Sequence, residues 1–128
     1  PQLFPGAQEL LEVLRQRFTL GLVTSGSSER VQRDLERNGL AGRFQVIITG
    51  GDVCQPKPDP EGLLNALGQL RVAPSQAIFV GDAAADAHMA QAAGVPFIGV
   101  LTQFSGDLPA GDYLRVRSLP ELAQLFTG

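Results

Sequence analysis

Residues 77–86 have the sequence AIFVGDAAAD, in which a short apolar run is followed by a turn and an alanine-rich segment. The apolar run predicts a buried strand over 77–80, and the segment Ala83–Ala93 predicts a helix that Gly94 ends. Asp82 therefore follows the carboxyl end of a strand. Asp86 comes four residues later, about one helical turn further on.

The two aspartates of this stretch can face the same space. Two carboxylates at a strand end suit a hard divalent cation such as Mg²⁺, which prefers oxygen ligands and keeps several waters. The same residues also have a structural explanation, in which Asp82 caps the helix and Asp86 stabilises its positive amino-terminal end. Both explanations stand at this point.

Strand and helix alternate on both sides of this stretch. Further strands are predicted at 19–23, 44–48, 95–101 and, as a short fifth, 113–116. Further helices are predicted over 7–18, over 28–37, after Asp59-Pro60 and after the capping box at 118–121. This pattern predicts an α/β, Rossmann-like, three-layer fold with a parallel sheet and helices on both faces. Because no repeat or linker interrupts it, residues 1–128 are predicted to form one domain.

Two further loops carry candidate site residues, because ligands of parallel sheets bind at the carboxyl ends of the strands. Thr24-Ser25-Gly26-Ser27 follows the strand at 19–23 and offers hydroxyl and amide donors to an anion. Lys57 is the only lysine, and the prolines of Pro56-Lys57-Pro58-Asp59-Pro60 restrict its backbone. Singly, these patterns are also explained by helix capping and by a solvated lysine. Combined with the aspartate pair, they match what holding a phosphoryl group with Mg²⁺ requires.

Composition excludes several classes of partner. The chain has ten basic and thirteen acidic residues, for a net charge of −3, and no basic block. Nucleic acid and anionic membrane are therefore not expected as partners. The sequence has no run of eighteen apolar residues and begins without a signal-peptide pattern. Its one cysteine, Cys54, fits a reducing compartment, which predicts a cytoplasmic location.

The order of these motifs resembles the haloacid dehalogenase superfamily, and the resemblance covers nearly the whole chain. Thr24 matches the phosphate-binding Ser/Thr of motif II, Lys57 matches the lysine of motif III, and Gly81-Asp82 with Asp86 matches the Gly-Asp-x-x-x-Asp form of motif IV. Phe4-Pro5-Gly6 resembles the point where such chains re-enter the core after their cap. The phosphoglycolate phosphatase-like branch is the most similar.

The resemblance implies a Mg²⁺-dependent phosphatase that acts on a small phosphorylated metabolite. Thr24, Ser25 and Gly26 would bind the phosphoryl group, and Lys57 would neutralise charge between it and the nucleophile. Asp82 and Asp86 would hold the Mg²⁺, Asp86 directly or through water. Thr24, Lys57 and Asp82 would thus be the catalytic residues of this chain.

Motif I of the superfamily, an Asp-x-Asp pair after the first strand, is missing from the sequence, and so is the cap inserted after it. Its first aspartate is the nucleophile that forms an aspartyl-phosphate. Its strand lies between the Thr24 strand and the Asp82 strand in the superfamily, so the sheet is expected to be incomplete here. We therefore expect residues 1–128 to be the carboxyl-terminal part of a core domain that a preceding segment or a separate chain completes. Alone, they are expected to be inactive.

Other functions are compatible with part of the pattern. A non-catalytic phosphate- or metal-binding member of the superfamily needs no motif I. A receiver-type signalling domain also uses Mg²⁺, acidic residues, threonine and lysine, but the proline-flanked Lys57 fits it poorly. Within the superfamily, a sugar phosphomutase, a nucleotidase and a pyrophosphatase share the same core.

Overall fold

The computed structural model describes residues 6–101 and 108–127. The strands are β1 (Gly21–Val23), β2 (Val46–Ile48), β3 (Phe79–Gly81), β4 (Phe97–Val100) and β5 (Leu114–Val116). The α-helices are α1 (Ala7–Arg15), α2 (Ser28–Arg37), α3 (Glu61–Leu70), α4 (Ala84–Ala93) and α5 (Leu119–Gln124). Two 3₁₀ turns, η1 (Gly50–Asp52) and η2 (Pro74–Gln76), follow β2 and precede β3. The α/β alternation predicted from the sequence is confirmed. Of the Phe4-Pro5-Gly6 segment, Phe4 and Pro5 lie outside the described residues.

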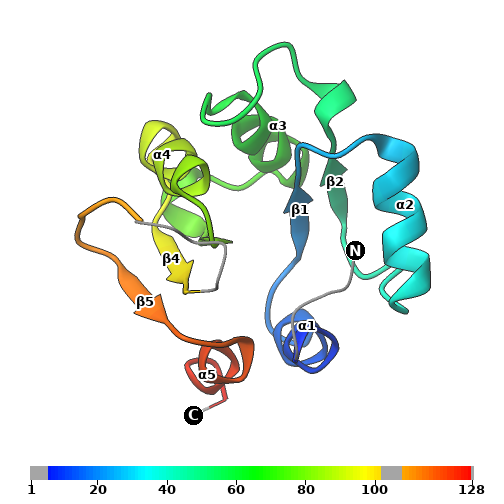
Figure 1. Ribbon diagram of the computed structural model, residues 1–128, viewed down its shortest axis with the longest axis vertical. Helices are drawn as coiled ribbons and strands as arrows, with labels where there is room; N and C mark the ends of the chain where they lie inside the picture. Colours follow the sequence, from blue (N-terminus) through cyan, green and yellow to red (C-terminus); the bar gives the residue numbers. More distant parts are fainter. Residues whose placement is uncertain (1–5, 102–107, 128) are drawn as a thin grey trace.

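The five strands form two separate parallel sheets (Figure 1). In one sheet β1 pairs with β2, with Leu22 opposite Ile47. In the other the order is β3-β4-β5, with Val80 opposite Ile98. Among the described residues, no ladder joins β1 to β3. The division falls between β1, which precedes Thr24, and β3, which precedes Asp82. The resemblance to the superfamily places the missing motif I strand between these two strands.

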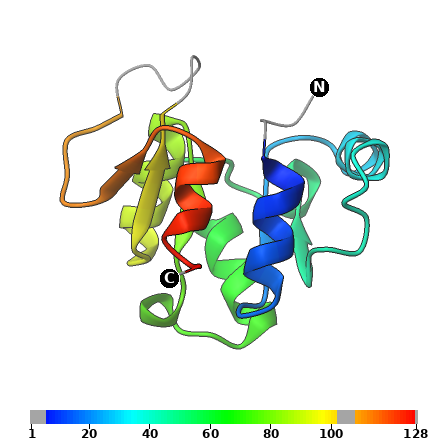
Figure 2. The same cartoon turned by 90° about the horizontal axis from the view of Figure 1, so that it is seen from below.

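Helices cover both faces of each sheet. On one face of the three-stranded sheet, α3 and α4 bury a cluster that includes Leu63, Leu67, Met89 and Ala90. On its other face α1 and α5 lie side by side (Figure 2) and bury Leu10 and Leu122 against β4 and β5. The two-stranded sheet packs between α2 on one face and α3 on the other. The molecule therefore has the three layers predicted.

Several element ends differ from the prediction. The helix expected over 7–18 ends at Arg15. The Arg17 amide donates to the carbonyl three residues back, that of Leu14, and the Phe18 amide shares the same acceptor. The strand expected over 19–23 begins at Gly21, and one hydrogen bond, from the Gln45 amide to the Leu20 carbonyl, extends its pairing.

The pair Asp59-Pro60 is typical of an N-cap followed by proline at the first helical position, but α3 begins one residue later, at Glu61. Pro60 is the residue that precedes α3, and the Asp59 carboxylate accepts a hydrogen bond from the Glu61 amide at 2.9 Å. The ends at Gly94 and Ser118 are as predicted: Gly94 has φ of 75°, and the Ser118 hydroxyl accepts from the Glu121 amide.

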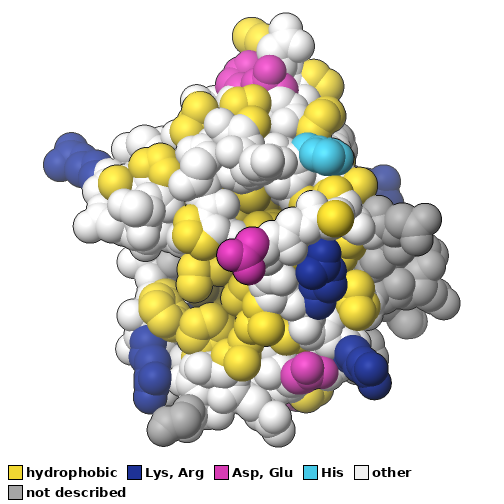
Figure 3. Space-filling model, turned by 90° about the vertical axis from the view of Figure 1, so that its left-hand side faces the viewer, with side chains coloured by type: hydrophobic (Ala, Val, Ile, Leu, Met, Phe, Trp, Pro, Cys, Tyr) yellow, Lys and Arg dark blue, Asp and Glu magenta, His cyan; other side chains and the backbone are white. Residues whose placement is uncertain are grey.

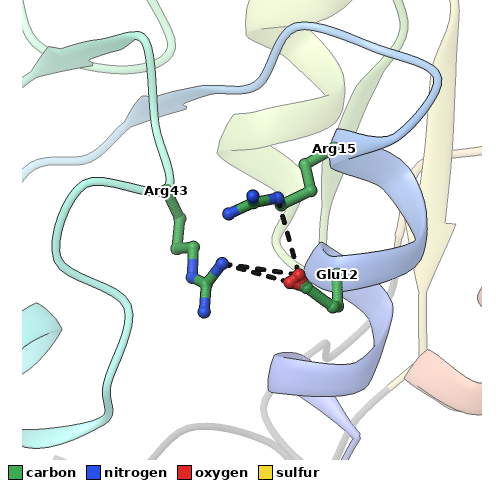
Figure 4. A network of polar contacts seen from close by, with 3 residues as sticks. All are labelled: Glu12, Arg15 and Arg43. Carbon is green, nitrogen blue, oxygen red and sulfur yellow. Dashed lines mark hydrogen bonds and ion pairs between the residues drawn. The ribbon is translucent and has the colours of Figure 1, made fainter.

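Polar contacts at the surface connect α1 with the loop before β2 (Figure 4). The Arg43 guanidinium donates to both carboxylate oxygens of Glu12, at 3.1 and 3.4 Å, and Arg15 lies 3.5 Å from the same carboxylate. All three side chains are a third or more exposed, so solvent weakens these ion pairs to about 0.2–1 kcal/mol each. They orient α1, and the buried apolar side chains hold it.

One face of the molecule illustrates how its charged side chains are distributed. On the face seen in Figure 3, apolar side chains lie across the middle, and the few acidic and basic side chains stand apart from one another. This face has no concentration of positive charge. None of the described helices is both long and apolar enough to cross a membrane.

Two leucines at the end of the last helix, one buried and one exposed, test how much burial contributes to the free energy of unfolding. Leu122 is fully buried against β4 and β5, whereas Leu125 on the same helix end is 48% exposed. Leu122→Ala should lower the free energy of unfolding by about 2–5 kcal/mol because it leaves a cavity. Leu125→Ala should change it by less than about 0.5 kcal/mol. Urea unfolding followed by circular dichroism measures both, and equal losses would contradict this packing.

Candidate active site

A cavity of about 600 Å³ brings together all six site residues predicted from the sequence. Thr24, Ser25 and Gly26 come from the loop after β1, Asp82 and Asp86 come from the segment after β3, and Lys57 comes from the loop before α3. The carboxyl ends of β1 and β3 therefore share one space, although the two strands belong to different sheets. A second cavity of about 340 Å³ shares Thr24, Ser25 and Lys57 with it.

The loop after β1 presents the Thr24 hydroxyl in a defined orientation. The Thr24 amide donates to the Ile48 carbonyl at 2.9 Å, which continues the β1–β2 ladder. The Thr24 Oγ1 accepts from the Gly26 amide at 3.2 Å. A threonine hydroxyl has one hydrogen to donate, and no described residue accepts it here. The hydrogen is thus available to a ligand oxygen, whereas the Gly26 amide is already engaged.

The explanation of this loop by helix capping, which the sequence offers for Ser27 or Ser28, is confirmed for Ser27. Ser27 precedes α2, and its Oγ accepts from the Arg30 amide at 3.3 Å. Capping thus uses Ser27 and leaves Thr24 and Ser25 at the cavity.

Lys57 and Asp86 form the closest ion pair among the described residues, with Nζ 2.7 Å from Oδ1. The Asp86 side chain is 9% exposed and the Lys57 side chain 21%. The ammonium also lies 5.9 Å from the centre of the Phe79 ring, within cation–π range. The peptide bond between Lys57 and Pro58 is cis.

Asp86 has two roles in this arrangement. Its Oδ2 accepts from the Ala83 amide at 3.2 Å, so the carboxylate also stabilises the amino-terminal end of α4. The structural explanation for Asp86 is therefore correct together with the ion pair. For Asp82 the capping explanation is wrong, because Ala83 occupies the position before α4. Asp82 lies at the cavity, directly after β3.

Gly81 entered the sequence reasoning as part of the Gly-Asp-x-x-x-Asp motif, without a role of its own. A Cβ at this position would lie 2.5 Å from the Asp86 Cβ and 2.7 Å from its Cγ. The Asp86 carboxyl group can approach the end of β3 only because residue 81 has no side chain. The signal was present in the glycine that directly precedes Asp82.

From the sequence, Thr49-Gly50-Gly51-Asp52 is the exit loop of β2, with Asp52 either bordering the site or part of a turn. In the structure, Gly50–Asp52 is a 3₁₀ turn fixed by the Asp52 carboxylate. The Asp52 Oδ2 accepts from the Thr49 amide at 2.7 Å and from the Thr49 hydroxyl at 2.8 Å. These hydrogen bonds, the amide bond first, hold the pKa of Asp52 below its ordinary value. The spacing Thr-x-x-Asp, typical of a capping box, was the signal in the sequence.

The donor set fits Mg²⁺ in part. No group of three or more His, Cys, Asp or Glu side chains that could hold a metal occurs among the described residues. Mg²⁺ commonly takes only one or two protein carboxylates and completes its shell with water and substrate phosphate. Asp82 and Asp86 meet that requirement, although both oxygens of Asp86 already have partners.

The charges around the cavity favour a cation. Its lining includes the carboxylates of Asp34, Asp82 and Asp86 but only the cationic side chains of Arg30 and Lys57. Lys57 is paired with Asp86, and the Arg30 Nε lies 4.0 Å from the Asp34 carboxylate. A phosphate dianion entering this cavity would therefore need a further positive charge beside it.

Comparison with known proteins identifies the family. The sequence profile of the haloacid dehalogenase-like hydrolases matches residues 1–100, which is most of the chain. The chain belongs to this family, and the resemblance stated from its motifs is confirmed.

Relatives of known activity include two phosphatases. Validoxylamine A 7'-phosphate phosphatase of Streptomyces hygroscopicus subsp. limoneus is 39% identical over 118 residues, 91% of this chain and 55% of that protein. Phosphoglycolate phosphatase of Escherichia coli K12 is 39% identical over 99 residues, 77% of this chain and 39% of that protein. The chain thus spans about half or less of the length of these relatives.

The fold agrees with solved members of the family. The crystal structure of a HAD phosphatase from Thermococcus onnurineus superposes with a TM-score of 0.86 at 32% identity, over 99% of this chain and 59% of the other. The α/β fold class is confirmed by this agreement.

The Lys57–Asp86 pair should be energetically coupled. Its partial burial places it between exposed pairs, worth about 0–1 kcal/mol, and buried pairs, whose disruption costs about 3–5 kcal/mol. We expect Lys57→Met to lower the free energy of unfolding by about 1–3 kcal/mol, because it leaves the Asp86 carboxylate without its cation. Adding Asp86→Leu should recover part of that loss, since no charge then remains buried.

A double-mutant cycle in urea measures this coupling. The Arg30–Asp34 pair serves as the control, and its coupling should be smaller because its atoms are 4.0 Å apart and the Arg30 side chain is 60% exposed. A coupling energy for Lys57 and Asp86 no larger than that of the control would contradict the expected gain from its closer contact and deeper burial.

Proposed function

We propose that this chain is the phosphate- and metal-binding portion of a Mg²⁺-dependent phosphatase that hydrolyses phosphate monoesters. The observation that carries the proposal is the convergence of Thr24, Ser25, Lys57, Asp82 and Asp86 on one cavity. They come from three separate segments of the chain, and helix capping accounts only for the bond between Asp86 and the Ala83 amide.

Each residue has a part in binding the phosphoryl group. The Thr24 hydroxyl donates its hydrogen to a phosphoryl oxygen, and the Ser25 and Gly26 backbone lies beside it. The Gly26 amide takes part only if it exchanges its bond to Thr24 Oγ1 for one to the ligand. Lys57, held by Asp86, places its charge between the Thr24 loop and the end of β3.

The metal is Mg²⁺, held by Asp82 and, directly or through water, by Asp86. When bound, it supplies the positive charge that the acidic lining lacks and shields the phosphoryl oxygens. The support for this proposal is the charge balance of the cavity and the oxygen-only donors at the end of β3.

The substrate is a small phosphorylated metabolite. By their names, one of the two relatives acts on validoxylamine A 7'-phosphate and the other on phosphoglycolate. Both compounds carry a phosphate on a small organic molecule. A cytoplasmic location is proposed with it, on the single cysteine.

The nucleophile is proposed to come from a segment outside residues 1–128, either earlier in the same protein or on a separate chain. Its strand would lie between β1 and β3. The support is the open edge of each strand among the described residues, and the exposure of Ile78 and Val80 at 51% and 37%. An apolar strand placed there would satisfy both edges and cover these side chains.

The activity is tested on the protein with its natural preceding segment. It should hydrolyse p-nitrophenyl phosphate with Mg²⁺, lose activity in EDTA and regain it when Mg²⁺ is restored. Thr24→Val and Asp82→Asn should each lower kcat/KM about 100-fold or more. Arg33→Ala, an exposed change on α2, is the control and should have no effect. Activity that persists in EDTA, or in the Asp82 variant, would contradict the proposal.

Residues 1–128 by themselves should show no turnover under the same conditions, because they contain no nucleophilic aspartate at the end of a central strand. Adding the preceding segment as a separate polypeptide should restore hydrolysis. Turnover by residues 1–128 without the preceding segment would contradict the proposal that the nucleophile lies outside these residues.

A further inference from the structure

The loop that carries Thr24 rests against the turn after β2, which is formed by Thr49 and η1 and is called here the 49–52 turn. The Gly50 amide donates to the Gly26 carbonyl at 2.9 Å. A Cβ at residue 50 would lie 2.5 Å from the Ser25 carbonyl oxygen and 3.2 Å from its carbon. The backbones of residues 25–26 and 50 are therefore in direct contact, with no room for a side chain between them.

The shape of this turn depends on one carboxylate. The Asp52 Oδ2 accepts from both the amide and the hydroxyl of Thr49, and the Asp52 amide donates back to the Thr49 carbonyl at 3.0 Å. Thr49 is 5% exposed, and Asp52 is the acceptor for both its amide and its hydroxyl, so removal of that carboxylate leaves both groups without their protein partner. Without Asp52, the turn loses the bonds that aim the Gly50 amide at Gly26.

We propose that Asp52 and Thr49 are positioning residues for phosphate binding: their hydrogen bonds fix the 49–52 turn, and Gly50 transmits that position to the backbone that carries Thr24 and Ser25. The proposal rests on the proposed function, since it assigns the 24–26 loop to the phosphoryl group. Asp52 does not line the cavity and touches no ligand in this scheme. It acts through the Gly50–Gly26 contact.

Phosphate binding should be sensitive to small displacements of the 24–26 loop. A binding group must be held to about 0.5 Å of its working position, and a displacement of about 1 Å can lower the rate about 100-fold. Two backbone hydrogen bonds connect the 24–26 loop to β2 and the turn that follows it. The Thr24 amide donates to the Ile48 carbonyl, and the Gly50 amide donates to the Gly26 carbonyl. Loss of the second leaves Ser25 and Gly26 held from one side only.

The bracing of the 49–52 turn by Asp52 should change with pH only in the acidic range, where the Asp52 carboxylate takes up a proton. Because its pKa in the folded protein is below the unfolded value, its stabilising contribution is present above the unfolded pKa, about pH 4. It is lost as the pH falls through the folded value. At neutral pH the brace is intact.

The test uses the protein with its natural preceding segment and two readouts, the inhibition constant of inorganic phosphate and hydrogen exchange at the Gly50 amide. Asp52→Ala should raise the inhibition constant about tenfold or more and remove the protection of the Gly50 amide. Asp52→Asn keeps an acceptor oxygen for Thr49 and should restore most of both. Gly50→Ala should weaken phosphate binding with Asp52 intact, because its methyl group displaces the Ser25 carbonyl.

Glu121→Ala is the matched control. Glu121 accepts a backbone hydrogen bond from Arg117 at the start of α5, so its loss also removes a turn-fixing carboxylate, but on an element that does not line the cavity. It should lower the melting temperature and leave the phosphate inhibition constant unchanged. A change in that constant equal to that of Asp52→Ala would mean that general destabilisation causes the effect, and would overturn the proposal.

The remaining outcomes separate this proposal from the proposed function. If the unmodified protein binds phosphate and Asp52→Ala binds it equally well, the positioning role is wrong and the function stands. If the unmodified protein neither hydrolyses phosphate esters nor binds phosphate, the proposed function fails and the positioning role fails with it. Loss of Gly50 protection in that case would still establish the hydrogen-bonded brace as a structural contact.

Discussion

The ion pair between Lys57 and Asp86 is the contact on which the arrangement of the site depends. Lys57 precedes α3 and belongs to the part of the chain around β1 and β2, whereas Asp86 lies on α4 after β3. The pair therefore joins the two sheets at their carboxyl ends. Gly81 makes the contact possible by leaving room for the Asp86 carboxyl group, and the Ala83 amide fixes its second oxygen. A single carboxylate thus orients the lysine, the helix and the strand end.

The divided sheet explains why this contact matters. With no ladder between β1 and β3 in the described residues, the two sheets are held together mainly by helices that pack on both. The helix α3 does this directly: Ala66 packs against Val46 and Ile48, and Leu63 and Leu67 pack against α4. Apolar burial is strong but non-directional. The ion pair adds the directional constraint that sets how the two strand ends face the cavity.

Sequence patterns predicted the elements and the candidate residues better than the contacts among them. Strand ends of a parallel sheet must share one edge, so the loops carrying Thr24, Lys57 and Asp82 could be grouped without coordinates. Helix ends were less accurate: Phe18 has the spacing of an α1 residue, but it packs on Phe126 from the turn beyond Arg15. The close approaches at Gly50 and Gly81 were missed because they involve residues distant in sequence, which no periodicity encodes.

The distribution of functional groups follows from the same geometry. Each proposed ligand group is fixed within one half of the molecule. Thr24 is held by β2 and the 49–52 turn. Asp82 directly follows β3, and Asp86 lies in the first turn of α4. A phosphoryl group bound between them would touch both halves. Its affinity therefore depends on how firmly the halves are joined, and a strand that paired with β1 and β3 would fix that distance through backbone hydrogen bonds. A segment that added this strand, proposed above as the source of the nucleophile, would in this way also order the proposed phosphate site, so that completing the sheet and completing the site would be coupled.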